Sequence, residues 1–358
     1  MNPCIVLNPL YYCPWGGENA LTTNLYHASK ATLFSLDKPH IFKYNNYNII
    51  LGGISMSDIM SYLFKTDAIK FCEENKPFWY TSGKIGPYFI NTHFVFGSEK
   101  EASEFLSFID ECLADKISLP KKVFEKAFNQ YQNNEIYRDV INTIKQYIEQ
   151  NIDVSEIDYI SGGERRDWFF SNMIAYLLNK PHITIFKDLS TVVSDSKFEH
   201  SEFISELKGK KVLHIADLIT VASSYLRAWI PAIKNLGSTM VWSCSVVDRM
   251  QGGKANIEAE GVKSLAVVNV DSSLFKKALD MGIINENQVT MLENFYSNPD
   301  ETMKNFLIAH PDFLENALQS DEKTRKRAKL LVDGNLYELN WDDFRDGGKI
   351  YLFPLMYL

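Results

Sequence analysis

The stretch Lys211-Val-Leu-His-Ile-Ala-Asp-Leu-Ile-Thr-Val-Ala-Ser-Ser224 decides the fold prediction. Its first half is an almost unbroken apolar run, which is typical of a strand buried on both faces of a sheet. The run ends in an acid, Asp217, followed by small and hydroxyl-bearing residues where a helix would begin. Backbone N–H groups and hydroxyls in that position bind phosphate. The stretch therefore predicts a phosphate-binding loop, although a strand followed by an ordinary serine-capped helix has the same pattern.

Apolar runs of strand length alternate with helix-length segments from residue 157 to residue 270. Such alternation predicts an α/β fold in which helices cover both faces of a parallel sheet. Ligands of these sheets bind at the carboxyl ends of the strands. In the helix expected after Ser224, Pro231 should cause a bend or a break, and Gly237 should cap the C-terminus.

The flanking regions have other patterns. Apolar residues at helical spacing predict three helices, over residues 105–113, 123–131 and 136–148. Residues 1–70 are rich in turn signals, which favour short strands and loops. Near the C-terminus, Asp333-Gly334 predicts the turn of a hairpin, followed by an apolar tail that would dock on the body or on a partner.

Composition limits the partners. The chain has 37 Lys and Arg against 45 Asp and Glu, a net charge of -8, which argues against nucleic acid or an anionic membrane as the main partner. We find no window of about 18 uncharged apolar residues that could span a membrane. The five cysteines are scattered and form no CxxC pair, so we expect reduced thiols and a cytoplasmic protein. His214 lies inside an apolar run and is expected in the core, and no histidine has the spacing of a metal site.

The opening stretch resembles the phosphoribosyl pyrophosphate motif of type I phosphoribosyltransferases, in which two acids precede a Thr/Gly/Ser loop that binds the 5′-phosphate. The match begins at Asp217, but the first acid of the motif is Ala216 here. By this resemblance, the residues that would hold the 5′-phosphate are Thr220, Val221, Ala222, Ser223 and Ser224.

Four further segments match in the family's order. Residues 247–253, Val-Asp-Arg-Met-Gln-Gly-Gly, are similar to a segment specific to the orotate branch. Residues 160–163 resemble the pyrophosphate loop, residues 185–188 resemble a strand end bearing a phosphate-contacting lysine, and residues 81–89 resemble a segment lining the base site. The resemblance implies a type I phosphoribosyltransferase domain over residues 76–285, with its core at 157–270. The extra regions would be a mixed strand and loop extension at 1–75 and a helical and hairpin extension at 286–358.

The resemblance also implies a set of site residues. Asp217 and Lys187 would be catalytic, with Asp217 near the ribose and, indirectly, the metal. Arg249 would face a carboxylate-bearing base such as orotate, although an Arg after a strand is usually a surface residue. The other implied residues are Gly162, Gly163, Arg165 and Arg166 for pyrophosphate, and Lys84 and Phe89 for the base. Arg165 and Arg166 could instead form only surface ion pairs.

The implied reaction is phosphoribosyl transfer from phosphoribosyl pyrophosphate to a pyrimidine base, orotate, with Mg²⁺ as cofactor and a homodimer as the expected assembly. Two departures leave alternatives open. One acid is lost at Ala216, and residues 191–207, which correspond to the family's closing loop, carry Lys197 and His200 at unusual spacing. The alternatives are a catalytically weakened regulatory protein that binds phosphoribosyl pyrophosphate or a nucleotide, and transfer to another acceptor.

Overall fold

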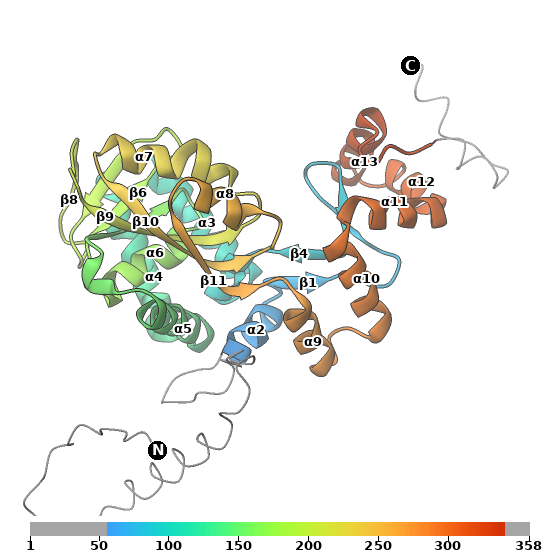
Figure 1. Cartoon of the computed structure of the whole chain (residues 1–358), viewed down its shortest axis with the longest axis horizontal. Coiled ribbons are helices and arrows are strands. Elements are labelled where there is room, and N and C mark those ends of the chain that lie inside the picture. The colour runs from blue at the N-terminus through green and yellow to red at the C-terminus, as the bar shows by residue number, and fades with distance from the viewer. Residues whose placement is uncertain (1–55, 341–358) are drawn as a thin grey trace, which may run out of the picture. The chain divides into compact units, whose positions relative to one another are not determined.

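A computed structural model describes residues 56–340 of the chain. Its centre is a seven-stranded sheet in the order β11-β10-β9-β5-β6-β7-β8 (Figure 1). The strands are β5 (Tyr159–Gly163), β6 (His182–Ile185), β7 (Thr191–Ser194), β8 (Ser201–Phe203), β9 (Lys211–Ile219), β10 (Thr239–Asp248) and β11 (Lys263–Asn269). Strands β11, β10, β9, β5 and β6 are parallel to one another, which confirms the predicted parallel sheet.

The other edge of the sheet corrects a prediction. Strands β7 and β8 add to β6 as an antiparallel hairpin, so residues 191–207, expected to be a closing loop, are partly strand. The turn between them is held by the Asp195 carboxylate, which accepts hydrogen bonds from the backbone N–H groups of Lys197, Glu199 and His200. A side chain that satisfies three turn amides stabilises a defined turn.

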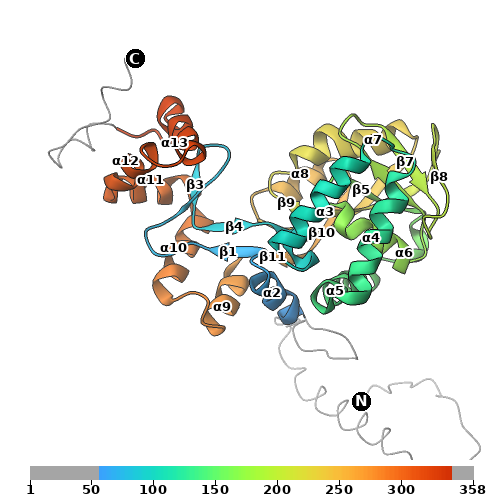
Figure 2. The same cartoon turned by 180° about the vertical axis from the view of Figure 1, so that it is seen from behind.

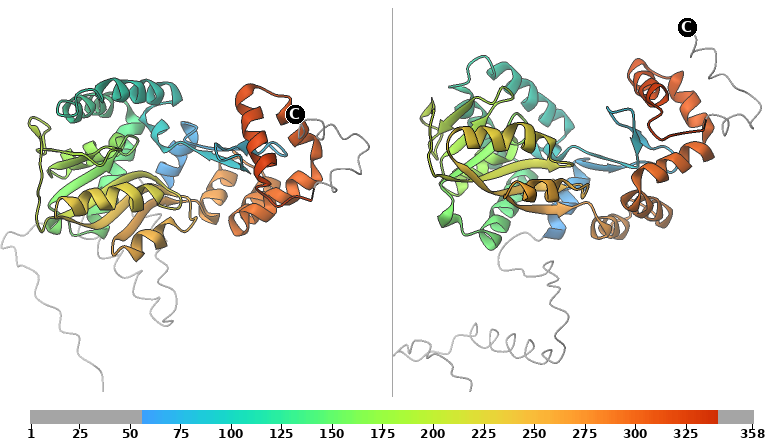
Figure 3. Two further views of the ribbon diagram at one scale, coloured as in Figure 1. Left: turned by 90° about the horizontal axis from the view of Figure 1, so that it is seen from above. Right: turned by 45° about the horizontal axis from the view of Figure 1, so that its top comes forward.

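Helices cover both faces of the sheet, as predicted (Figures 2 and 3). One face packs against α3 (Glu99–Cys112), α4 (Leu119–Asn133), α5 (Glu135–Asn151) and α6 (Trp168–Leu177), and the other packs against α7 (Ile230–Asn235) and α8 (Gly253–Ala259). In β9, Leu213 and Ile215 face the first layer, whereas Val212 and Ala216 face the second. This alternation explains why the strand is apolar throughout, since both of its faces are buried.

The three predicted helical stripes are confirmed as α3, α4 and α5. Ser98 and Asn134 cap the first and third of these helices by accepting hydrogen bonds from the backbone N–H groups of Glu101 and Tyr137. The 3₁₀ turns η2 (Thr92–Phe96) and η3 (Val154–Glu156) complete this part of the chain.

The helix after β9 is divided, as Pro231 predicts. A π-helical turn, η4 (Tyr225–Trp229), runs directly into α7, and Pro231 follows it in the first turn of α7, where the irregular turn accommodates a residue without an N–H. Gly237 follows the helix with φ 71°, a left-handed conformation that suits a glycine cap.

A second group of elements lies beside the sheet and holds its own small strands. Antiparallel pairs join β1 (Ile69–Phe71) to β4 (Tyr88–Ile90) and β2 (Phe78–Trp79) to β3 (Ile85–Gly86). They pack with α9 (Ser272–Asp280), α10 (Glu286–Ser297), α11 (Pro299–Ala309), α12 (Pro311–Leu318) and α13 (Glu322–Gly334). The Trp79 ring stacks on Phe313 with centroids 5.5 Å apart, and the Tyr337 hydroxyl lies 2.8 Å from the backbone N of Ile85. The helices near the C-terminus are therefore tied to residues 78–90.

Two predictions for the flanking regions are wrong. Asp333 and Gly334 are the last residues of α13 and not a hairpin turn, because Ala328 and Leu331 continue a buried helical stripe into this segment. Met56–Lys65 form helix α2 within a region where strands and loops were expected. The remaining expectations for residues 1–55 and for the apolar tail at 341–358 lie outside the described residues. The division of the chain into 1–75, 76–285 and 286–358 stays a prediction. Among the described residues, no helix is long and apolar enough to cross a membrane.

Candidate functional site

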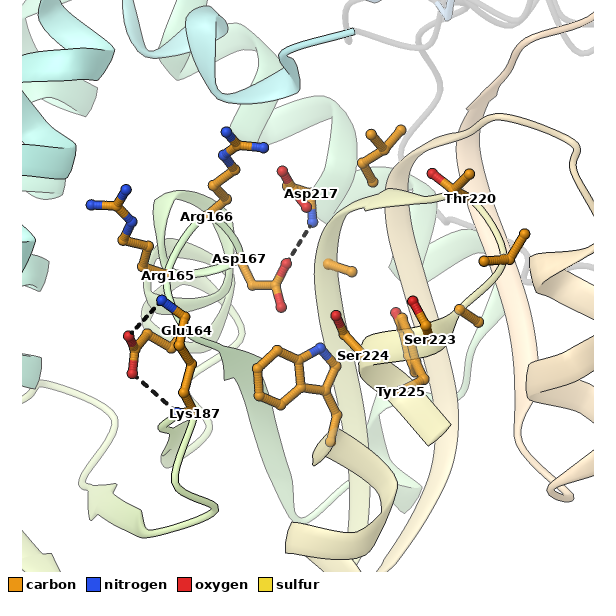
Figure 4. A pocket seen from close by; sticks show the side chains of 15 residues that line it. Glu164, Arg165, Arg166, Asp167, Lys187, Asp217, Thr220, Ser223, Ser224 and Tyr225 are labelled. Atoms are coloured by element: carbon orange, nitrogen blue, oxygen red, sulfur yellow. Dashed lines mark hydrogen bonds and ion pairs between the residues drawn. The ribbon is translucent and has the colours of Figure 1, made fainter. Parts of the chain in front are cut away.

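The loop between β9 and η4 forms the floor of a pocket of about 340 Å³ (Figure 4). The structure brings most of the predicted phosphate and pyrophosphate residues together in its lining. That lining comprises Glu164, Arg165, Arg166, Asp167, Lys187, Ala216, Asp217, Leu218, Thr220, Val221, Ala222, Ser223, Ser224, Tyr225 and Trp229. The pocket opens at the carboxyl ends of β5, β6 and β9, where ligands of parallel sheets bind.

The backbone of the loop turns sharply at Ala222, which has φ 59°. The left-handed region is unfavourable for a residue with a Cβ, and the phosphoribosyltransferase motif has glycine in this part of its loop. Ala222 therefore adopts a backbone conformation that glycine would adopt at a lower energetic cost.

Two carboxylates meet at the inner wall of the pocket. The Asp167 Oδ1 atom accepts a hydrogen bond of 2.9 Å from the backbone N–H of Asp217, and a dashed line marks this contact in Figure 4. Burial, and then the nearby charge of Asp167, raise the pKa of the Asp217 carboxyl well above its ordinary value. This part of the pocket would therefore be stabilised by a bound cation or a hydrogen-bond donor.

The two neighbouring arginines differ in their freedom. The Arg165 guanidinium forms an ion pair with Asp110 of α3 and donates to the Leu106 carbonyl oxygen, 3.3 Å away. Arg166 forms no ion pair within 4.0 Å among the described residues, although its charge lowers the pKa of the nearby Asp217 carboxyl, and in Figure 4 its guanidinium points in a different direction from that of Arg165. Arg166 is therefore the arginine that is available to an anion in this pocket.

Lys187 lies at the rim of the pocket, with its side chain 70% exposed. Its Nζ atom is 3.3 Å from Glu164 Oε1, and its backbone N–H donates to Glu164 Oε2 at 3.0 Å. Glu164 thus fixes both the backbone and the ammonium group of Lys187 and partly neutralises its charge.

The predicted glycines do not line the pocket themselves. A Cβ added to Gly162 would lie 2.2 Å from Ser171 Oγ, and one added to Gly163 would lie 2.3 Å from Trp229 Cε2. Both positions therefore require glycine for packing. Gly163 contributes to the site through its backbone N–H, which donates to Asp167 Oδ2 at 2.9 Å.

A second pocket, of about 820 Å³, adjoins the first and shares Arg166, Leu218 and Thr220 with it. It contains all three residues predicted for the base site. These three residues are Lys84, Phe89 and Arg249. The rest of the lining comprises Tyr80, Thr81, Ser82, Ile85, Ile90, Asn91, Met250, Gln251, Phe295, Tyr296, Pro299, Asp300 and Tyr337.

Arg249 lies between aromatic rings in this second pocket. Its guanidinium carbon is 5.5 Å from the centroid of Tyr80 and 5.3 Å from that of Tyr88, which are distances of cation–π contact. Its Nε atom is buried and has no hydrogen-bond partner among the described residues. A buried donor without a partner is costly, so the pocket is suited to a ligand that accepts a hydrogen bond from Arg249.

Comparisons with known proteins found two curated relatives that are similar to parts of this chain. Orotate phosphoribosyltransferase of Sulfolobus acidocaldarius is 25% identical over 128 residues, which cover 35% of this chain and 60% of that protein. Orotate phosphoribosyltransferase of Pyrococcus horikoshii is 44% identical over 71 residues, which cover 20% of this chain and 37% of that protein. The chain is similar to orotate phosphoribosyltransferases.

This orotate phosphoribosyltransferase-like chain spans less than two thirds of the length of either curated relative. No family model matches it. Among solved structures, UMP synthase of Leishmania donovani superposes with a TM-score of 0.47 and 18% identity, over 67% of this chain and 42% of that one.

The orotate phosphoribosyltransferase-like chain departs from the family pattern at the closing loop. Lys197 and His200 lie in the turn of the β7–β8 hairpin and do not line either of the two adjoining pockets. His200 lines a separate pocket of about 670 Å³ with Ser118 and Tyr159. His214 is buried, as predicted, with Nδ1 2.9 Å from Ser161 Oγ.

Sequence reasoning missed two sets of site residues. Asp167 lies in the loop after β5, and a motif comparison does not find it because it considers acids at position 216 and not acids that arrive from another loop. Phe295, Tyr296, Asp300 and Tyr337 come from a segment assigned to an extension, yet they line the second pocket. No sequence signal connects them to residues 80–91. The described residues contain no cluster of three or more His, Cys, Asp or Glu that could hold a metal ion on its own.

Proposed function

We propose that this chain transfers the phosphoribosyl group of phosphoribosyl pyrophosphate to a pyrimidine base, orotate, and releases pyrophosphate. The observation that carries the proposal is the junction of the two pockets at Arg166, Leu218 and Thr220. Group transfer needs both substrates to meet with their reacting atoms in contact, and two pockets with a common wall allow this. The similarity to orotate phosphoribosyltransferases supports the same assignment.

The first pocket would hold phosphoribosyl pyrophosphate. The hydroxyls of Thr220, Ser223 and Ser224, with the backbone N–H groups of their loop, suit a 5′-phosphate dianion. Arg166 and Lys187 lie across the pocket from this loop and would bind the pyrophosphate group. The raised pKa of Asp217 beside Asp167 fits a cation at this wall, so Asp217 would hold the substrate's Mg²⁺ through water. When bound, Mg²⁺ would neutralise charge on the leaving pyrophosphate.

The second pocket would hold the acceptor. Arg249 offers a guanidinium to a carboxylate of the base, and Tyr80 and Phe89 offer flat apolar surfaces to its ring. The acceptor nitrogen forms a bond to C1′ while the bond from C1′ to the pyrophosphate oxygen breaks, and pyrophosphate leaves with the electron pair. The proton of the nitrogen passes to solvent. The chain contributes by positioning the substrates and by stabilising the departing negative charge.

The test is pyrophosphate release by the purified chain with phosphoribosyl pyrophosphate, Mg²⁺ and orotate, alongside a panel of other bases. Asp217→Asn is the inactive control, and Asp158→Asn is the matched control because Asp158 lies outside the pocket lining. Turnover with orotate that Asp217→Asn abolishes and Asp158→Asn retains would support the proposal. A different preferred base would reassign the acceptor.

The β7–β8 hairpin favours a second candidate, a regulatory protein that binds phosphoribosyl pyrophosphate without turning it over. Neither the hairpin turn nor its Lys197 lines the first pocket, so this segment does not exclude water from the reacting atoms. Calorimetric binding of phosphoribosyl pyrophosphate without turnover on any base would favour this candidate. We propose a homodimer in either case, which light scattering would test.

A further inference from the structure

The wall of the first pocket contains two carboxylates although the sequence motif retains only one. Position 216, where the motif has its first acid, is Ala216, which lines the pocket without any charge. Asp167 comes from the loop after β5, and its Oδ1 atom lies 2.9 Å from the backbone N of Asp217, the residue that follows Ala216. A carboxylate is therefore present beside position 216, although it is supplied by another segment of the chain.

The hydrogen bonds of Asp167 leave it able to bind a ligand. Oδ1 accepts from the backbone of Asp217 and Oδ2 accepts from the backbone of Gly163, each at 2.9 Å. A carboxylate has about four acceptor positions, and the two backbone hydrogen bonds occupy one on each oxygen. Asp167 lines the pocket, and its two backbone contacts fix the carboxylate against rotation.

Two buried polar side chains, His214 and Ser161, lie next to Asp167 and outside the pocket lining. The Nε2 atom of His214 lies 3.5 Å from Asp167 Oδ2 and has no hydrogen-bond partner among the described residues. Ser161 fixes the other ring nitrogen of His214 at 2.9 Å. The two backbone hydrogen bonds already hold the Asp167 carboxylate in place, so the buried His214 ring beside it is not needed to fix the loop.

We propose that Asp167 replaces the missing motif acid and contacts the ribose hydroxyls of the phosphoribosyl substrate. This inference rests on the proposed function for one point only, namely that the substrate is a phosphoribosyl compound. The sugar would lie between the 5′-phosphate loop at Thr220–Ser224 and the pyrophosphate cations, and Asp167 and Asp217 together line the wall between those two sites. Asp167 accepts hydrogen bonds from the hydroxyls in the way the lost acid would.

The experiment measures binding and not turnover, so it does not depend on catalysis. The probes are ribose 5-phosphate and its 2,3-dideoxy analogue, titrated by calorimetry into the full chain. We expect the parent to prefer ribose 5-phosphate by about tenfold or more, since a hydrogen bond to a charged group gives a preference of that order. In Asp167→Asn, this preference should fall towards one.

Asp158→Asn is the matched control. Asp158 also accepts two hydrogen bonds, one of them from the β9 backbone at Lys211 N, but it lies at the opposite end of the strand and outside the pocket. It should keep the parental preference. Adding Ala216→Asp to Asp167→Asn should restore the preference, because it returns a carboxylate to the same wall.

Three results would overturn the inference: a parent that does not distinguish the two probes, an Asp167→Asn variant that keeps the parental preference, or a double variant that folds without recovering it. If Asp167→Asn shows no cooperative thermal transition, Asp167→Ser takes its place because its hydroxyl accepts a backbone hydrogen bond without carrying a charge, and an unchanged preference in that variant also overturns the inference. Loss of turnover on every base, with the sugar preference intact, would refute the proposed function and leave the role of Asp167 standing.

Discussion

Lys84 and Asp300, 216 residues apart in the sequence, form an ion pair in which the lysine Nζ lies 2.7 Å from both carboxylate oxygens. The pair lies in the lining of the second pocket, so a residue of α11 neutralises a cation that would otherwise face the acceptor.

Asp300→Asn should increase the preference of the second pocket for anionic acceptors. The two side chains are 40% and 59% exposed, so the pair contributes at most about 1 kcal/mol to stability, and the variant should fold normally. With Lys84 released, the affinity for orotate relative to uracil should rise about threefold or more. Asp312→Asn, which removes an exposed charge outside the pocket, is the control. An unchanged orotate-to-uracil ratio would mean that Lys84 does not face the acceptor.

Ala222→Gly should stabilise the phosphate loop. The residue has φ 59°, and a left-handed conformation costs a residue with a Cβ about 1 kcal/mol. The free energy of unfolding in urea should therefore rise by about 0.5 to 1 kcal/mol. Ala232→Gly in α7 is the contrasting control and should lower it by about 1 kcal/mol, because that backbone is helical. A loss of stability in Ala222→Gly would show that the loop has another conformation.

Gly163→Ala should displace Trp229 from the pocket wall. The added methyl would lie 2.3 Å from Trp229 Cε2, and such overpacking costs about 1 to 3 kcal/mol. Trp229→Leu in the same chain should relieve the strain, which a double-mutant cycle of unfolding free energies measures as a favourable coupling. Strictly additive effects would place the two residues out of contact.

His93→Phe should reduce the loss of stability in acid. Burial, together with the charges of Arg166 and Arg165, lowers the pKa of His93 to about 3. Between pH 6.5 and pH 3 the unfolded chain therefore binds a proton that the native His93 does not, and stability falls with falling pH by up to about 1.4 kcal/mol per unit. At pH 5, relative to pH 7, the variant should be stabilised by about 2 kcal/mol against the parent. Urea unfolding at both values tests this.

The control for this prediction is His200→Gln, because His200 is exposed and makes no buried contact of this kind. It should follow the parental pH dependence. If His93→Phe also follows the parent between pH 7 and pH 5, burial does not suppress the protonation of His93.

The parallel sheet was predictable because β9 and its neighbours are apolar on both faces, and the position of the loop that lines the first pocket was predictable because Thr220 to Ser224 follow the strand end directly. The antiparallel hairpin was not, since β8 contains only Ser201–Phe203 and its pairing depends on the edge that β7 offers. The hairpin turn predicted at Asp333-Gly334 was wrong because the dipeptide indicates a turn from local sequence alone. The burial of Leu331, which extends α13, depends on residues that are distant in the sequence. The lining of the second pocket depends on the same kind of distant contact.

The Tyr337 hydroxyl is hydrogen-bonded to the backbone of Ile85, and this contact affects the order in which the two pockets are completed while the chain is synthesised. The first pocket is complete in sequence once Trp229 has been made, whereas the wall of the second needs a residue more than a hundred positions further on. Because the N-terminal part of a chain emerges from the ribosome first, the residues that line the first pocket would be available before those that complete the second pocket. Ligands of the first pocket are thus able to stabilise the sheet while translation continues.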